Sequence, residues 1–226
     1  MTNYVTNTND GRPKLGIFET FKTKRQSLTG EAQRQRSIII CLATQNNPAQ
    51  RTRTAIAQKI AEENGSLWKN IYSGIFRDLD EILIPLGMVE EAGRLPLRRG
   101  PKALQEKGIP YYSLTEQGLL VALSLDEIIG REKILDRFLA TSKADASFKE
   151  QIMALAKFSP RFTYSLFKNY VKVYCEGDIG LLPLEKDRFI KASEEMVIIQ
   201  REFLESYSSM PKTEREKMLG FLSNGA

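Results

Sequence analysis

The chain has 226 residues, 42% of them hydrophobic, which is enough for one substantial core or two modest ones. It contains no histidine and only two cysteines, so mechanisms that use imidazole are excluded and a zinc site is disfavoured. The formal charge of +5 is uneven, because residues 1–36 carry a net +4 and residues 37–110 a net +2, whereas the remainder carries −1. A local excess of positive charge indicates where a polyanion would bind.

The chain shows no sign of membrane insertion. No apolar run approaches the roughly 20 residues that span a bilayer, and the N-terminus lacks the apolar core of a signal peptide. We therefore expect a cytoplasmic protein without membrane contact. Cys41 and Cys175 lie far apart, within predicted helices and among apolar neighbours, which favours buried free thiols over a disulfide.

Residues 1–30 are polar and basic and show no sustained periodicity, which predicts a disordered or loosely held N-terminal arm. A small apolar group could pin part of this arm to the fold, namely Leu15, Ile17, Phe18 and Phe21. The basic residues of the arm fit a phosphate contact and a solvated tail equally well.

Three helices are predicted next, over residues 31–45, 52–64 and 66–84. Asn46-Asn47-Pro48 ends the first helix, and Gly65 supplies the left-handed residue after the second. One face of the third helix is apolar and should point toward the core. This face comprises Ile71, Ile75, Leu79, Ile82, Leu83 and Leu86.

A β-hairpin with a long basic tip is predicted after the third helix. Its strands are Met88-Val89-Glu90-Glu91 and the segment 109–114, and a further helix begins at Thr115. The tip, residues 94–108, holds five basic residues and one acid. Loops of that length are commonly functional, and a basic tip suits a phosphate backbone or a minor groove. A loop that is charged only for solubility would have the same composition.

The order helix, helix, helix, strand, basic loop, strand, helix resembles the winged helix-turn-helix family of DNA-binding domains. The resemblance covers about residues 31–124 and is carried by Leu86-Gly87-Met88-Val89-Glu90 and by Tyr111-Tyr112-Ser113-Leu114-Thr115-Glu116-Gln117-Gly118. It implies that helix 66–84 reads the major groove and that the wing, residues 94–108, contacts the adjacent backbone or minor groove.

The resemblance also implies which side chains would meet DNA. In the third helix they are Lys69, Asn70, Ser73 and Arg77. In the wing they are Arg94, Arg98, Arg99 and Lys102. Arg51 and Arg53, at the start of the second helix, are candidate phosphate contacts.

The sequence departs from the family pattern at the end of the third helix. Ile82 lies one residue further from Gly87 than the last core leucine usually does. Pro85 interrupts the helix, because proline lacks an N–H and clashes with the preceding turn. We therefore expect the final turn to be kinked or unwound.

Residues 125–226 are predicted to form an all-helical C-terminal domain. Capping boxes starting at Ser124 and Ser147 predict helices over 125–142 and 147–158. Ser159-Pro160 then opens a helix that ends near residue 177, since proline fits the first helical position.

The longest helical pattern covers residues 185–208 and carries an apolar stripe. A stripe of this length favours a homodimer through these helices, and packing on the domain's own helices is the open alternative. The residues that would form the dimer contact are Phe189, Met196, Ile199, Phe203 and Tyr207.

The sequence contains none of the usual signatures of nucleotide binding or nucleophilic catalysis. The acidic pairs are expected on solvent-facing surfaces, without a nucleophile or third ligand nearby. These pairs are Asp78/Asp80, Glu90/Glu91 and Glu194/Glu195. We therefore expect neither an enzyme nor a cofactor nor a metal site.

The fold expected from the sequence is mainly α with a small β-hairpin, as a winged helix-turn-helix domain over 31–124 followed by an all-helical domain over 125–226. The expected function is that of a prokaryotic transcriptional regulator, nucleoid-associated and bound to double-stranded DNA. The alternative is a winged-helix protein-interaction or scaffold module. It is kept because Asp78, Asp80 and Glu81 would repel phosphate if they faced it.

Overall fold

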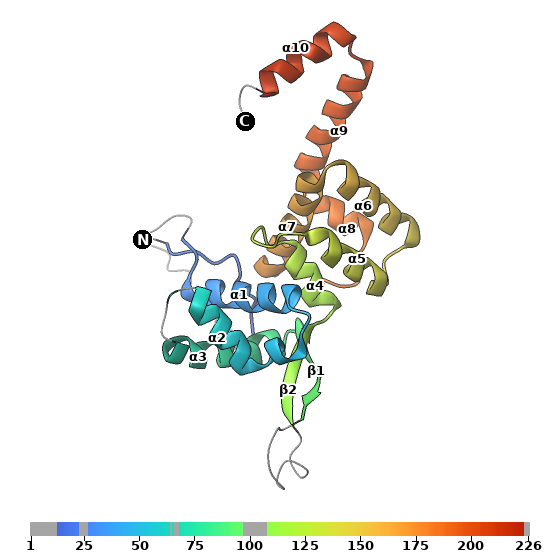
Figure 1. The fold of residues 1–226 in the computed structure, drawn as a ribbon. Helices are drawn as coiled ribbons and strands as arrows, with labels where there is room; N and C mark the ends of the chain where they lie inside the picture. Colours follow the sequence, from blue (N-terminus) through green and yellow to red (C-terminus); the bar gives the residue numbers. More distant parts are fainter. Residues whose placement is uncertain (1–12, 23–26, 64, 66–67, 97–107, 224–226) are drawn as a thin grey trace, which may run out of the picture.

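The computed structural model describes residues 13–22, 27–63, 65, 68–96 and 108–223, with the backbone alone for 68–71. Within these residues the chain is mainly helical and has one two-stranded antiparallel sheet (Figure 1). The expected fold class, mainly α with a small β-hairpin, is therefore confirmed.

The first half of the chain contains α1 (Gly30–Thr44), the 3-10 helix η1 (Pro48–Arg51), α2 (Arg53–Glu63), α3 (Trp68–Arg77), the π-helix η2 (Asp78–Leu83), β1 (Val89–Leu95), β2 (Ile109–Leu114) and α4 (Glu116–Leu123). The second half contains α5 (Arg131–Thr141), α6 (Ala146–Phe158), α7 (Pro160–Glu176), α8 (Lys186–Lys191), α9 (Glu194–Ser209) and α10 (Lys212–Ser223).

Local capping places the first two helices close to where the sequence predicts them. The Thr29 hydroxyl accepts a hydrogen bond from the Ala32 amide at 3.1 Å where α1 begins. The Thr52 hydroxyl accepts from the Ala55 amide at 3.3 Å where α2 begins. The apolar faces of both helices are buried in the core.

The third helix changes from α to π geometry before Pro85. The Ile84 amide donates to the Leu79 carbonyl at 2.9 Å, five residues back rather than four. Pro85 accounts for the wider turn, because its ring would clash with the carbonyl four residues earlier. Of the apolar residues predicted to face the core near this end of the helix, Leu83 is fully buried, whereas Ile82 and Leu86 are only partly buried.

The hairpin is longer than predicted. β1 and β2 pair from Val89 opposite Leu114 to Leu95 opposite Ile109, with an irregularity between Glu91 and Gly93. Because β1 extends to Leu95, Arg94 lies in the strand rather than in the loop assigned to it. Residues 97–107, most of the predicted wing, lie outside the described residues.

The N-terminus of α4 is fastened to the turn that precedes the hairpin. The Thr115 amide donates to the Met88 carbonyl at 3.1 Å, and the Thr115 hydroxyl donates to the Gly87 carbonyl at 2.5 Å. The same hydroxyl caps α4 by accepting from the Gly118 amide at 3.2 Å. Gly118 lies directly over the Met88 carbonyl, since a Cβ there would be 2.1 Å from that oxygen.

The segment after α4 does not form the helix start predicted at Ser124. Ser124 is buried, and its hydroxyl donates to the Val121 carbonyl at 2.6 Å where α4 ends. A turn follows, and α5 begins only at Arg131, after Gly130 with φ +74°. The predicted helix 125–142 is therefore confirmed in its second part only.

α6 and α7 lie where they were predicted, with one different cap. The Asp145 carboxylate, rather than Ser147, caps α6 by accepting from the Phe148 amide at 3.0 Å. α7 begins at Pro160 and is followed by Gly177 with φ +95°, the left-handed conformation common at helix ends.

The long helix predicted over 185–208 is interrupted by a turn between α8 and α9. Phe189 of α8 is 2% exposed and packs against the rings of Phe148 and Phe167, with ring centroids 5.7 and 4.9 Å away. It belongs to the core of its own chain, unlike the exposed members of the predicted stripe, Ile199 and Phe203.

One hydrophobic cluster runs through both halves of the chain. α4 is central to it, because every residue from Gly118 to Leu123 is buried and the helix contacts α1, α5 and α7. Leu15 and Ile17 belong to the same cluster. The Gly16 amide between them donates to the Gln35 side chain at 2.9 Å, which holds this part of the N-terminal segment against α1.

An ion pair joins α1 to the turn after α4. Nε and Nη2 of Arg36 donate to the two carboxylate oxygens of Glu127, at 2.8 and 2.6 Å. Burial raises the pKa of Glu127, but the hydrogen bonds and charge of Arg36 outweigh it and hold this pKa below its usual value. A lowered folded-state pKa stabilises the fold above the unfolded-state pKa, and this stabilisation is lost as the pH falls.

We expect Glu127→Gln to lower the free energy of unfolding at neutral pH, because it removes the charge that binds Arg36. The difference from the wild type should shrink as the pH falls through the unfolded-state pKa of about 4.3, because the unfolded chain then binds a proton that the folded carboxylate does not yet bind. Urea denaturation followed by circular dichroism at several pH values measures this difference. A difference that stays constant down to about pH 3 would contradict the contribution of charge.

Cys41 and Cys175 are free thiols, as predicted. Cys41 is buried and Cys175 is half-buried. Burial raises their pKa values to about 11 and about 12, so both are protonated at neutral pH and unreactive. In the part of the chain that the structure describes, no helix combines the length and the hydrophobicity needed to cross a bilayer.

Candidate nucleic-acid interface

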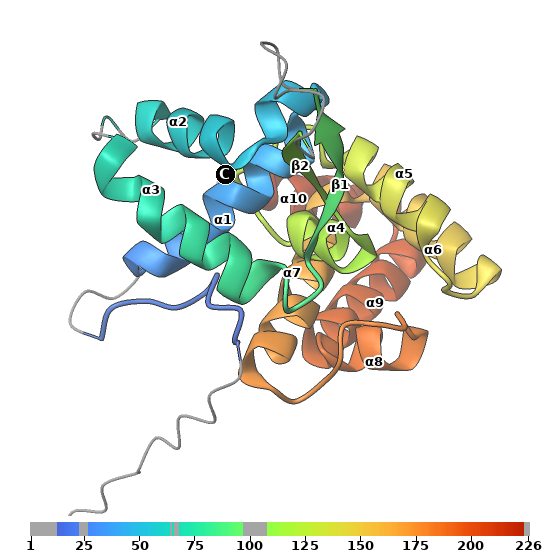
Figure 2. The ribbon, with the colours of Figure 1, turned by 90° about the horizontal axis from the view of Figure 1, so that it is seen from below.

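α2, α3 and the hairpin lie at one end of the molecule, whereas α9 and α10 lie at the other (Figure 1). In the view from below, α3 lies in front and is not covered by α5–α10 (Figure 2). The helix and the hairpin that were expected to meet DNA therefore share an end of the molecule that the C-terminal half leaves open.

Arg51 and Arg53 lie where α2, α3 and the hairpin meet. The guanidinium carbon of Arg51 is 5.4 Å from the centre of the Tyr111 ring in β2. The guanidinium carbon of Arg53 is 5.5 Å from the ring of Phe76 in α3 and 5.3 Å from that of Tyr112 in β2. Because a cation is attracted to the face of an aromatic ring, these contacts hold both arginines against the hairpin and hold Arg53 against α3 as well.

Arg51 and Arg53 differ in how far their charge is neutralised. Arg53 forms an ion pair with Asp80, and the two side chains are 32% and 38% exposed. No carboxylate among the described residues forms an ion pair with Arg51, and its buried Nε has no hydrogen-bond partner there. Burial raises the pKa of Tyr112 although Arg53 opposes the shift, so the ring beneath Arg53 is uncharged at neutral pH.

A buried carboxylate ties α1 to the end of α3. Nε of Arg34 donates to one oxygen of Asp78 at 2.7 Å, and Nη2 reaches the other at 3.4 Å. Nη2 of Arg77 is 3.7 Å from the same carboxylate. The side chain of Asp78 is fully buried, whereas those of Arg34 and Arg77 are 24% and 55% exposed. Arg34 passes α3 at Gly74, where a Cβ would be 2.8 Å from its Nε.

This contact corrects the placement of Asp78 on a solvent-facing surface. Asp80 is exposed as expected, but Asp78 faces inward and is bound by Arg34. Sequence reasoning missed Arg34 because its partner lies 44 residues away. The one available signal was Gly74, which lies one turn before Asp78 and leaves room beside the helix.

The other expected contact residues are found in different situations. Ser73 and Arg77 are exposed on α3. Arg94 is exposed, but its guanidinium donates to both oxygens of Glu91 at 2.6 and 3.0 Å. The side chains of Lys69 and Asn70 lie outside the described residues, as do Arg98, Arg99 and Lys102 altogether.

Three of the described arginines of this surface have a carboxylate partner, and Arg51 has none among the described residues. The pairs are Arg53–Asp80, Arg77–Asp78 and Arg94–Glu91. A phosphate group would have to compete with these carboxylates. The exposed pairs Arg53–Asp80 and Arg94–Glu91 are worth at most about 1 kcal/mol each, so exchanging their carboxylate for a phosphate costs little.

The other two acidic pairs lie on exposed surfaces of the strand β1 and the helix α9. Glu90 and Glu91 are exposed on β1, and Glu194 and Glu195 are exposed on α9. Among the residues described, no group of three or more potential ligands is close enough to hold an ion.

No protein-family model, curated protein or solved structure matches the chain. The proposal for its function therefore rests on its own residues and their geometry.

Proposed function

We propose that the protein is a winged-helix regulator of transcription that binds double-stranded DNA in the cytoplasm, at the nucleoid. In this proposal α3 enters the major groove, and the tip of the hairpin contacts the adjacent backbone or minor groove. The observation that carries the proposal is the position of Arg53, which contacts α3 through Phe76 and β2 through Tyr112. Arg53 therefore joins α3 and the hairpin in one surface and adds a positive charge to it.

Three further observations support DNA as the partner. Arg51 lies beside Arg53 and has no ion-pair partner among the described residues, so its charge is available to a phosphate. The tip, residues 94–108, adds five basic residues against one acid. The surface of α3 is left uncovered by the C-terminal half (Figure 2).

A second candidate function is protein binding, as a scaffold or interaction module. It is favoured by the ion pairs of Arg53 and Arg94, which give this surface mixed charge rather than a purely positive one. Asp80 and Glu81 are also exposed beside α3, where they would oppose a phosphate.

Fluorescence anisotropy with a labelled random-sequence duplex separates the two candidates. DNA binding predicts association at low salt and a linear fall of log Kobs with log salt, by about 0.9 for each phosphate neutralised. A duplex that is not bound even at low salt would favour the protein-binding function.

Replacing Arg98 and Arg99 by alanine should weaken binding to all duplexes by roughly tenfold to thirtyfold, because two phosphate contacts are lost. The salt slope should fall by about two. The matched control is the double variant Lys157→Ala and Arg161→Ala, which removes the same charge from exposed positions where α6 ends and α7 begins. Equal losses in the two variants would mean that only net charge matters and would refute the role of the wing.

A further inference from the structure

The last two helices form an arm that the other described residues contact only at its base, where Met196 and Val197 pack against the core. α9 leaves the body of the molecule, and α10 turns back from its far end without reaching the body (Figure 1). Neither helix contains a buried residue. Helices of 16 and 12 residues are marginal in water on their own, so their stability requires packing from elsewhere.

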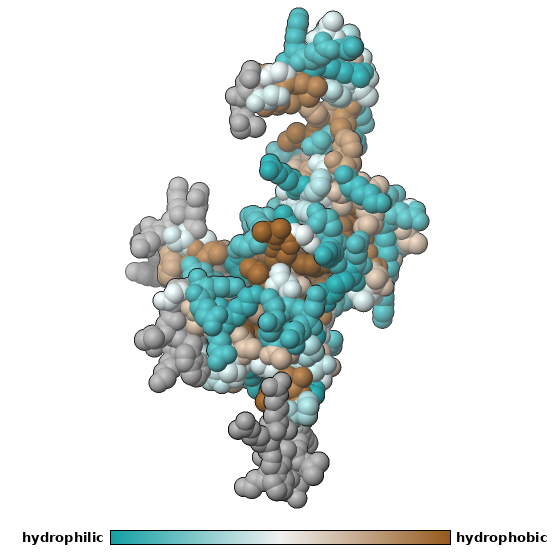
Figure 3. Space-filling view, viewed as in Figure 1, coloured by the Kyte–Doolittle hydropathy of each residue, from teal (hydrophilic) through white to brown (hydrophobic). Residues whose placement is uncertain are grey.

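Large apolar side chains are concentrated on this arm. Seven of them are at least 38% exposed, namely Ile198, Ile199, Phe203, Leu204, Leu219, Phe221 and Leu222. Figure 3 shows apolar surface along α9 and on the side of α10 that faces the body. At about 200 Å² for a fully exposed large side chain, the seven expose roughly 700 Å². Each partner in a standard protein interface buries about 800 Å².

The corner between α9 and α10 is braced, which keeps the arm open. Nε of Arg215 donates to the Met210 carbonyl at 2.7 Å, and Nη2 donates to the Ser208 carbonyl at 2.6 Å. The guanidinium carbon also lies 5.2 Å from the centre of the Tyr207 ring. Because these contacts fix the direction of α10, this helix is held away from its own body.

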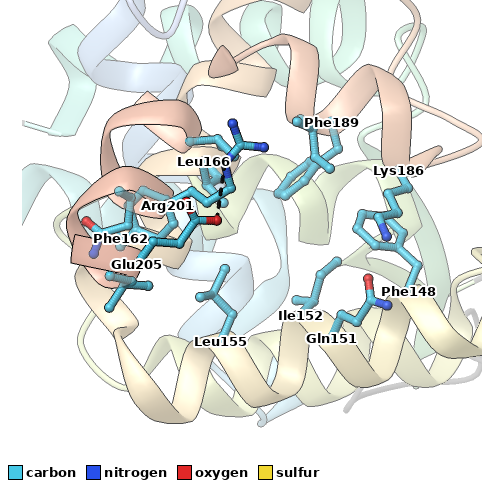
Figure 4. A pocket seen from close by; sticks show the side chains of 14 residues that line it. Phe148, Gln151, Ile152, Leu155, Phe162, Leu166, Lys186, Phe189, Arg201 and Glu205 are labelled. Carbon is cyan, nitrogen blue, oxygen red and sulfur yellow. Dashed lines mark ion pairs between the residues drawn. The ribbon is translucent and has the colours of Figure 1, made fainter. Parts of the chain in front are cut away.

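An apolar groove lies at the base of the arm, between α6, α7, α8 and α9 (Figure 4). Its volume is about 310 Å³, and Ile152, Leu155 and Phe162 form part of its walls. Leu204 of α9 lines the groove and is itself 39% exposed, so the apolar surface of the arm continues into the groove. An uncovered arm and an unfilled groove thus occur side by side in one molecule.

We propose that the protein forms a two-fold dimer in which α10 of each copy packs into the groove of the other. In a two-fold dimer both grooves are filled and both arms are covered at the same time, and no binding surface is left over for further copies. Dimerisation of this kind does not depend on DNA binding.

The charges of the arm favour this pairing over contact between the two α9 helices. α9 carries four acidic residues and one basic residue, whereas α10 carries three basic residues and two acidic ones. Crossing α10 of one copy over α9 of the other therefore brings opposite net charges together. Pairing α9 with α9 would set acidic residues against acidic residues.

Light scattering of the full chain after gel filtration tests the assembly. The wild type should have twice the 25.7 kDa mass of one chain, and Phe221→Glu should have the mass of a single chain. Phe221 is 79% exposed, so its replacement leaves the monomer fold intact. The matched control is Phe158→Glu, at a site 73% exposed outside the arm, which should remain a dimer. A monomeric wild type, or a dimeric Phe221→Glu variant, overturns the proposal.

Cross-linking tests which surfaces meet. One chain carries Gln151→Cys at the rim of the groove, and a second chain, with a different tag, carries Leu222→Cys in α10. A bifunctional thiol reagent should link the two chains in the mixed dimer, and the wild type gives the background from the native cysteines. No link above this background overturns the proposal. A chain that carries both substitutions provides a second test. If its main product is a link within one chain, α10 occupies the groove of its own chain and the proposal is overturned.

Discussion

Replacing Arg34 by alanine is expected to lower the free energy of unfolding by about 3 to 5 kcal/mol, the usual cost of removing one partner from a buried ion pair. The loss is large because the Asp78 carboxylate is fully buried and would lose its closest partner. Arg77 is a weak replacement, since its Nη2 is 3.7 Å away and its side chain is 55% exposed. Urea denaturation followed by circular dichroism measures the change.

Two further variants separate this ion pair from other effects of the substitution. Adding Asp78→Asn to Arg34→Ala should recover part of the loss, because the buried charge is then removed as well. Arg137→Ala, at an exposed position in α5, should change stability by less than about 0.5 kcal/mol. If Arg34→Ala resembles Arg137→Ala, the contact between α1 and η2 contributes nothing.

Gly118→Ala is expected to destabilise the protein by about 3 kcal/mol or more, or to prevent folding, through overpacking against the backbone. The added Cβ would be 2.1 Å from the Met88 carbonyl oxygen, which accepts the hydrogen bond from the Thr115 amide. Neither group can move without separating α4 from the turn before the hairpin. Thermal and urea unfolding of the variant measure the loss.

Gly220→Ala is the matched control, since it is the same substitution inside another helix. Among the described residues of its own chain, none lies within 4 Å of a Cβ at Gly220. Alanine is the better helix former by about 0.5 to 1 kcal/mol, so this variant should be neutral or slightly more stable. Equal destabilisation by both substitutions would show that the contact with Met88 is not what makes glycine necessary at position 118.

Local signals predicted the fold well where they act within one turn of chain. Pro160 begins α7 and Gly177 follows it, because each residue meets a backbone requirement of a helix end. The helix start predicted at Ser124 was wrong because of a contact with the preceding helix. Ser124 is buried at the end of α4, so its hydroxyl bonds to a carbonyl of that helix and cannot cap the next one.

The candidate site was less predictable, because it depends on contacts between distant segments. The apolar period of the third helix did not reveal that Asp78 faces inward, since its burial requires Arg34 from α1. Arg51 and Arg53 were identified from the sequence as basic residues at a helix start. Their contacts with Tyr111 and Tyr112 could not be identified from the sequence, because these contacts depend on how the hairpin crosses the helices.

The burial of α4 determines what happens when the chain is cut. Truncation or proteolysis just after Ser124 would leave α4 attached to the hairpin end while removing α5 and α7, which cover it. Six consecutive buried residues would then meet water, and the other fragment would lose the helix around which it folds. We therefore expect neither fragment to be stable alone, and we expect the hairpin end and the α5–α7 end of the intact chain to melt in one transition.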